Sequence, residues 1–99
     1  MPAYLIYQRL ELWDSSFRET YRTLAEASMR KYGGKYLTVS RNNILLEGHG
    51  LPEVVAILEF PSVEAAQDWY HSEDYQAAVK ARNAGSRASF MIVPSHPRP

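Results

Sequence analysis

The chain has 99 residues, carries eleven acidic and eleven basic side chains, and contains no cysteine. This length fits one compact domain, and the balanced charge lacks the basic surface that nucleic acids and anionic membranes attract. Without cysteine the chain forms no disulfide, thiolate zinc site, iron–sulfur cluster or cysteine nucleophile. Residues 1–4 do not begin a basic segment followed by a long apolar run. We therefore expect no signal peptide, no membrane span and a cytoplasmic location.

The first predicted elements are a strand and a helix. Residues 3–12 alternate in their second half, with Gln8 and Leu10 on one face and Arg9 on the other, as a strand does. The cluster 14–16 is typical of a helix N-terminus, and Ser16 with Glu19 matches a capping box. Apolar side chains then recur every three or four residues up to residue 32, which predicts an amphipathic helix over 16–32. The glycines at 33–34 predict its left-handed C-cap.

Two strands are predicted in the middle of the chain. Residues 35–39 form the second strand, the polar segment 40–43 forms a turn, and strand character resumes over 44–47. Residues 54–60, V-V-A-I-L-E-F, are the clearest strand because they are rich in β-branched and apolar residues.

The last part of the chain predicts a broken helix and a final strand. Ser62 is placed to cap a helix over 62–70, and Ser72 to cap a second helical stretch over 72–82. Residues 87–93 read as the fourth strand, which Pro94 ends. We expect the remaining residues, 95–99, to be a flexible tail after a single domain over 1–94.

The order strand, helix, strand, strand, helix, strand predicts a ferredoxin-like βαββαβ domain, a two-layer α+β sandwich. Helices would cover only one face of such a sheet. Large apolar side chains lie on both faces of the predicted strands, so the helix-free face also needs cover. The simplest cover is the same face of a second copy, which predicts a twofold homodimer.

Four segments carry a resemblance to a known family. They are residues 32–37 (Y-G-G-K-Y-L), 46–48 (L-E-G), 58–62 (L-E-F-P-S) and 69–76 (W-Y-H-S-E-D-Y-Q). In order and spacing they resemble the bacterial domain of unknown function 1330 family, within the dimeric α/β-barrel superfamily. The resemblance implies a ferredoxin-like protomer and a dimer whose two sheets close a barrel. His71 stands where that family often has Asp, and the end of the last strand also differs, so no role of an acid is carried over there.

Glu59 and Arg9 are the candidate catalytic residues. Glu59 interrupts the most apolar strand, and a partly desolvated carboxylate suits a general acid or base. Arg9, on the neighbouring first strand, is its expected partner and would bind a carboxylate or enolate oxygen. The alternative is that the two residues form a structural ion pair at the dimer interface. Arg82 and Arg87 are weaker candidates of the same kind.

Aromatic residues are the candidate ligand-binding residues, because they combine apolar area with a polar group. The predicted set comprises Tyr7, Tyr32, Trp69, Tyr70 and Tyr75, with Tyr36 beside them. Plain core packing is the alternative for each of them. His49, His71 and His96 lack the spacing of metal ligands, so we expect neither a metal site nor a cofactor.

Two functions follow from these residues. The first is an uncharacterised small-molecule-binding protein, which could be a cofactor-independent enzyme using acid/base chemistry in a pocket between sheet and helices. The second is a non-catalytic dimerising module that binds a ligand or a protein. The sequence does not decide whether the protein is an enzyme, and it does not identify the small molecule. An RNA-binding role shares the element order but lacks the basic and aromatic signature on the strands.

Overall fold

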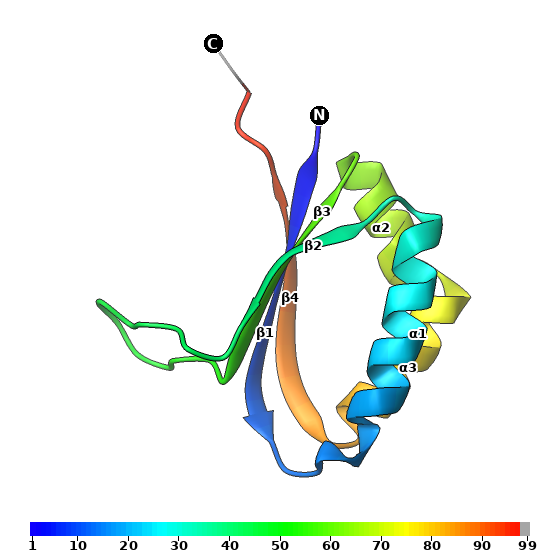
Figure 1. The fold of residues 1–99 in the computed structure, drawn as a ribbon. Coiled ribbons are helices and arrows are strands. Elements are labelled where there is room, and N and C mark those ends of the chain that lie inside the picture. The colour runs from blue at the N-terminus through cyan, green and yellow to red at the C-terminus, as the bar shows by residue number, and fades with distance from the viewer. Residues whose placement is uncertain (98–99) are drawn as a thin grey trace.

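The computed structural model describes residues 1–97 and has a four-stranded antiparallel sheet with all its helices on one face (Figure 1). The elements in chain order are β1 (Ala3–Leu12), α1 (Arg18–Lys31), β2 (Lys35–Ser40), β3 (Val54–Phe60), α2 (Val63–His71), α3 (Glu73–Asn83) and β4 (Ser86–Pro94). A short 3₁₀ helix, Ser15–Phe17, precedes α1. The strand order is β2-β3-β1-β4, so the first and third strands are central. This arrangement confirms the predicted ferredoxin-like α+β fold.

The register of the central strands decides which side chains face the helices. Tyr7 of β1 lies opposite Ala56 of β3 and Phe90 of β4, and Arg9 lies opposite Val54. Burial alternates along β1 and β3, so that odd-numbered β1 residues and even-numbered β3 residues face the helices. The other face carries the even-numbered β1 residues and Glu59, which are only partly buried.

The core between the layers is centred on Trp69 of α2. Its ring centroid lies 3.9 Å from that of Tyr75 and 5.3 Å from that of Phe60. Trp69 Nε1 donates to Ser28 Oγ at 3.0 Å, and Ser28 Oγ in turn donates to the Ala25 carbonyl. A buried indole N–H needs such an acceptor, so Ser28 completes the packing of α1 against α2.

Three helix ends follow the sequence signals. Ser62 Oγ accepts from Ala65 N at 3.0 Å, and Ser72 Oγ accepts from Tyr75 N at 3.2 Å, so both predicted N-caps are present. Gly33 has φ +76°, and Gly34 N donates to the Met29 carbonyl at 3.1 Å. This is the Schellman arrangement expected of a glycine C-cap, and it ends α1.

Two local predictions are wrong. The capping box of Ser16 and Glu19 does not form, because Asp14 accepts from Ser16 N and caps the 3₁₀ helix, while α1 begins at Arg18 without a side-chain cap. Residues 44–47 are not a strand. The segment between β2 and β3 projects beyond the sheet (Figure 1), where no strand within residues 1–97 pairs with it. Ile44 and Leu46 are accordingly 84% and 89% exposed.

The end of the chain leaves the sheet beside its beginning. Ser95 N donates to the Pro2 carbonyl at 3.2 Å, and residues 95–97 have no regular structure. Residues 98 and 99 of the predicted tail lie outside the described part of the chain. No helix within residues 1–97 combines the length and the apolar character that crossing a bilayer requires.

Candidate functional site

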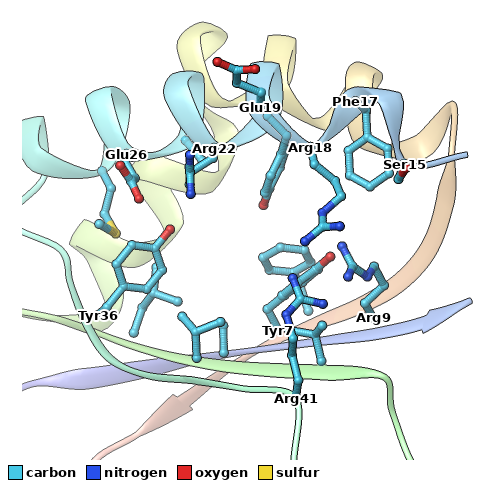
Figure 2. A pocket seen from close by; sticks show the side chains of 18 of the residues that line it. Tyr7, Arg9, Ser15, Phe17, Arg18, Glu19, Arg22, Glu26, Tyr36 and Arg41 are labelled. Carbon is cyan, nitrogen blue, oxygen red and sulfur yellow. The ribbon is translucent and has the colours of Figure 1, made fainter. Parts of the chain in front are cut away.

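A pocket of about 970 Å³ lies between α1 and the helix-facing side of the sheet (Figure 2). Its floor is formed by side chains of the central strands, among them Tyr7, Ala56 and Leu58. Met29 of α1 and Phe90 of β4 add apolar walls. Pockets for small ligands typically have this size, with an apolar lining and a few placed polar groups.

The charged residues of the lining are unbalanced. Arginines come from the sheet, from the loop after β2 and from the start of α1, and they are Arg9, Arg18, Arg22 and Arg41. Only two acidic residues, Glu19 and Glu26, share the lining. Figure 2 shows that Arg9, Arg18 and Arg41 point toward one another at one end of the pocket, whereas Glu26 lies at the other end beside Tyr36. One end of the pocket is therefore positively charged.

Arg9 is the buried member of this group. It is 5% exposed, and its Nη2 donates to Glu53 Oε1 at 3.0 Å. Arg41 Nη1 lies 3.7 Å from the same Glu53 oxygen, so one carboxylate is shared between two guanidinium groups. Arg9 Nε is buried without a hydrogen-bond partner among the described residues. The Nε atom of Arg82 is buried in the same way, so an unpaired Nε is not by itself the mark of a ligand site.

The tyrosines beside this end are neutral hydrogen-bonding groups. Burial raises the pKa of Tyr7, against the opposing effect of Arg9 and Arg82. Burial raises the pKa of Tyr21 to about 12, and it raises that of Tyr75 as well. All three phenols therefore stay protonated at neutral pH and can act as donors.

A second buried arginine stands behind the pocket. Arg82 of α3 is 5% exposed, and its Nη1 donates to Tyr75 Oη at 3.1 Å. Its guanidinium carbon lies 4.5 Å from the centroid of the Phe90 ring. Tyr75 Oη is in turn 2.7 Å from Tyr21 Oη, and Tyr21 lines the pocket. Hydrogen bonds thus connect a buried cation on α3 with a pocket residue on α1.

The predicted partnership of Arg9 and Glu59 is wrong for this fold. Arg9 faces the helices, whereas Glu59 lies on the helix-free face and is paired across the strands with Tyr4. Glu59 Oε1 instead lies 3.4 Å from Lys35 Nζ. In this register odd-numbered β1 residues pair with even-numbered β3 residues, as Arg9 does with Val54, so the odd-numbered Arg9 and Glu59 lie on opposite faces. A catalytic role for either residue stays a prediction.

The structure also separates the predicted aromatic residues. Tyr7 and Trp69 line the pocket, together with Tyr36. Tyr75 is fully buried behind Tyr21, and Tyr70 lines a separate, smaller recess beside Phe90. Tyr32 follows the end of α1 and is half-buried outside the pocket lining. Whether these residues bind a ligand stays a prediction.

Several lining residues were missed by the sequence analysis. Arg18 and Arg22 are one helical turn apart, which is the spacing of neighbours on one face of a helix, and this signal could have identified them. Arg41 follows β2 in a stretch that reads as a polar turn, and no sequence signal places it at the pocket. Within residues 1–97, no group of three or more His, Asp or Glu side chains could hold a metal ion.

The sheet order, the one-sided helix layer and the cavity between the layers define a ferredoxin-like α+β protein. The family described as Domain of unknown function (DUF1330) matches residues 2–96. The chain belongs to this family, as its sequence motifs predicted. No curated protein matches it.

Solved structures with this fold include proteins of different descriptions. A protein of unknown function from Rhodopseudomonas palustris is 19% identical, with 98% of this chain and 84% of that chain covered and a TM-score of 0.76. A dimeric ferredoxin-like protein of unknown function from Jannaschia sp. CCS1 is 8% identical, with 96% and 100% covered and a TM-score of 0.73. SnoaB, a cofactor-independent oxygenase from Streptomyces nogalater, is 10% identical, with 98% and 94% covered and a TM-score of 0.59. At these identities the likeness concerns the fold alone.

Proposed function

We propose that the protein binds a small organic anion in the pocket between α1 and the sheet. The observation that carries this proposal is the cluster of Arg9, Arg18 and Arg41, which line the pocket and point toward one another at one of its ends. A carboxylate or enolate oxygen would accept hydrogen bonds from these guanidinium groups, and a planar apolar body would contact Tyr7, Leu58 and Phe90. Cofactor-independent chemistry on such an anion belongs to the proposal, because the neighbour SnoaB is described as a cofactor-independent oxygenase.

The test uses 2-naphthoate as the anionic probe and 2-naphthamide as its uncharged isostere, each followed by NMR chemical-shift titration. We expect the wild-type protein to bind 2-naphthoate more tightly than the amide. Arg9→Met removes the buried guanidinium and should raise the Kd for 2-naphthoate by about 10- to 100-fold, the range for losing a charge-assisted hydrogen bond.

Arg87→Met is the matched control for this substitution. Arg87 pairs with Glu11 at 2.7 Å on an exposed part of the sheet and does not line the pocket. Its substitution should leave the affinity unchanged. Arg41→Met gives a second, exposed pocket variant whose fold is not at risk. Equal affinity of wild type, Arg9→Met and Arg41→Met for the probe would contradict the proposal.

We also propose that two copies associate through the helix-free sheet face. Met91 and Val93 of β4 are exposed there, beside the partly covered Ile6 and Ile57. The neighbour from Jannaschia is described as dimeric, which supports a homodimer of this chain. A dimer of this kind is compatible with the second candidate function, a dimerising module, and it would place Glu59 in the space between two sheets.

Native mass spectrometry tests this association with a matched pair of lysine variants. Ile57→Lys introduces a charge at the centre of the helix-free face and should convert a dimer to a monomer, because burying an unpaired ammonium is costly. Thr23→Lys introduces the same charge on the exposed side of α1 and should leave the dimer intact. A wild-type protein that is monomeric would refute the proposed interface.

A further inference from the structure

The buried hydrogen bonds between α3 and α1 have a direction that the donor inventory of each group fixes. Arg82 carries only donors, so at its contact with Tyr75 the phenol oxygen must accept. Tyr75 has a single hydroxyl hydrogen left to donate, and its oxygen lies 2.7 Å from Tyr21 Oη. Two arrangements of the Tyr75–Tyr21 contact are then conceivable, and they differ in which phenol gives its hydrogen.

Burial distinguishes the two arrangements. Tyr75 is 0% exposed, and Tyr21 is the only acceptor within hydrogen-bonding distance of its hydroxyl among residues 1–97. If Tyr21 donated to Tyr75, the Tyr75 hydrogen would be buried without an acceptor, at the usual penalty for an unmade hydrogen bond. If Tyr75 donates to Tyr21, every polar group of Tyr75 is satisfied, and the Tyr21 hydrogen remains free beside the pocket that Tyr21 lines.

We infer that Arg82, Tyr75 and Tyr21 form an oriented hydrogen-bond chain that presents the Tyr21 hydroxyl as a donor to an oxyanion of the ligand. This inference rests on the proposed function and makes it more specific. The ligand's negatively charged oxygen would meet two kinds of donor, the Arg9 guanidinium and the Tyr21 phenol. Tyr75 and Arg82 do not touch the ligand in this arrangement, so they are positioning residues.

The positive charge of Arg82 strengthens the hydrogen bonds that lead from it through Tyr75 to Tyr21. Arg82 has no ion pair with a carboxylate among the described residues. Besides Tyr75, its guanidinium meets the Asn83 side chain and the Phe90 and Tyr21 rings, and its Nε has no hydrogen-bond partner within residues 1–97. A cation at the end of a hydrogen-bond chain polarises each bond along it, and the low dielectric of the core increases the effect. The free hydrogen of Tyr21 therefore becomes a better donor than that of an isolated phenol. It prefers an anionic oxygen to a neutral one, because charge-assisted hydrogen bonds are the stronger kind.

The direction of the hydrogen bond between Tyr75 and Tyr21 can be tested in the ligand-free wild-type protein. A buried, hydrogen-bonded hydroxyl proton exchanges slowly, and NMR can correlate it through bonds with the ring carbons of its own tyrosine. We expect the proton between the two phenols to correlate with the Tyr75 ring. Correlation with the Tyr21 ring would overturn the inference, whether or not the pocket binds an anion.

The role in binding is tested with 2-naphthoate and with 2-methylnaphthalene, which has the same rings and no hydrogen-bond acceptor. Tyr21→Phe should raise the Kd for 2-naphthoate about 10-fold, and Tyr75→Phe about 3-fold, since the Tyr21 hydroxyl is then no longer held in one orientation. Neither substitution should change the affinity for 2-methylnaphthalene. Tyr4→Phe, on the other face of the sheet, is the control and should bind both probes as the wild type does.

Two failures are distinguishable in this experiment. A wild-type protein that binds 2-naphthoate no better than 2-methylnaphthalene would refute the proposed anion site itself. The second failure is a wild-type protein that prefers 2-naphthoate while the variants at Tyr21 and Tyr75 lose affinity for both probes equally. This result would overturn the inferred role of the hydrogen-bond chain. In that case the two tyrosines would serve only to shape the pocket.

Discussion

Ionisation of Tyr21 at alkaline pH should destabilise the protein by an amount that follows from its environment. Burial raises the pKa of Tyr21 from 10.0 to about 12, while Tyr75 and Arg82 act in the opposite direction. The folded protein therefore keeps a proton on Tyr21 that the unfolded chain has already lost. The stabilisation from this group is fully present below pH 10.0 and disappears as the pH rises toward about 12.

The magnitude can be worked out for about pH 11. This pH is about one unit above the pKa of Tyr21 in the unfolded chain and about one unit below its pKa in the folded protein. The difference corresponds to a loss of about 1.4 kcal/mol in the free energy of unfolding. Burial raises the pKa values of Tyr7 and Tyr75 too, so their contributions have the same sign.

Urea unfolding at about pH 8 and about pH 11 measures this effect in the wild type, in Tyr21→Phe and in the control Tyr4→Phe. The comparison uses the change between the two pH values, because removing the Tyr21 hydroxyl also alters the stability at neutral pH. Between these two pH values, the free energy of unfolding should fall by about 1.4 kcal/mol less in Tyr21→Phe than in the wild type. Tyr4→Phe should behave as the wild type does. Equal losses in wild type and Tyr21→Phe would refute the reasoning.

Two further predictions concern residues on either side of the sheet. Ser28→Ala should lower the free energy of unfolding by about 1 to 3 kcal/mol, because it leaves the buried Trp69 Nε1 without its acceptor; urea unfolding measures this, and a neutral result would show that the indole finds another partner. Glu59→Gln should leave the Kd for 2-naphthoate unchanged, because Glu59 lies beside Lys35 on the face away from the pocket. An affinity loss comparable to that of Arg9→Met, seen by the same NMR titration, would mean that the helix-free face contributes to the site.

The order of elements was predictable because local signals in this sequence agree with the fold. Ser62 and Ser72 cap the helices they precede, and Gly33 ends α1 in a left-handed conformation. Strand alternation also sorted the residues of Val54–Phe60 correctly into two faces. Residues 44–47 have the composition of a strand but lie where no partner strand reaches, and a partner is a property of the tertiary structure.

The site was less predictable, because it depends on register and on buried charge. Strand alternation places Arg9 on the same face as Leu5 and Tyr7, but nothing local indicates that the helices cover this face or how it is registered with the faces of Val54–Phe60. The assumed partnership of Arg9 with Glu59 failed for that reason. Arg82 was considered only as a weaker binding residue, although its burial against Phe90 and its bond to Tyr75 arise from the packing of α3 on the sheet. Contacts between residues far apart in sequence leave no pattern in a single sequence.

The most direct test of the anion site observes the Arg9 Nε–H group itself. Its NMR resonance can be assigned by its absence in Arg9→Met and then followed during titration with 2-naphthoate and with 2-naphthamide. Binding of the carboxylate by the Arg9 guanidinium predicts a saturable shift of this resonance with 2-naphthoate and a much smaller one with the amide. If 2-naphthoate binds while the Arg9 Nε–H resonance stays in place, the ligand's charge is recognised elsewhere and the proposed site is wrong.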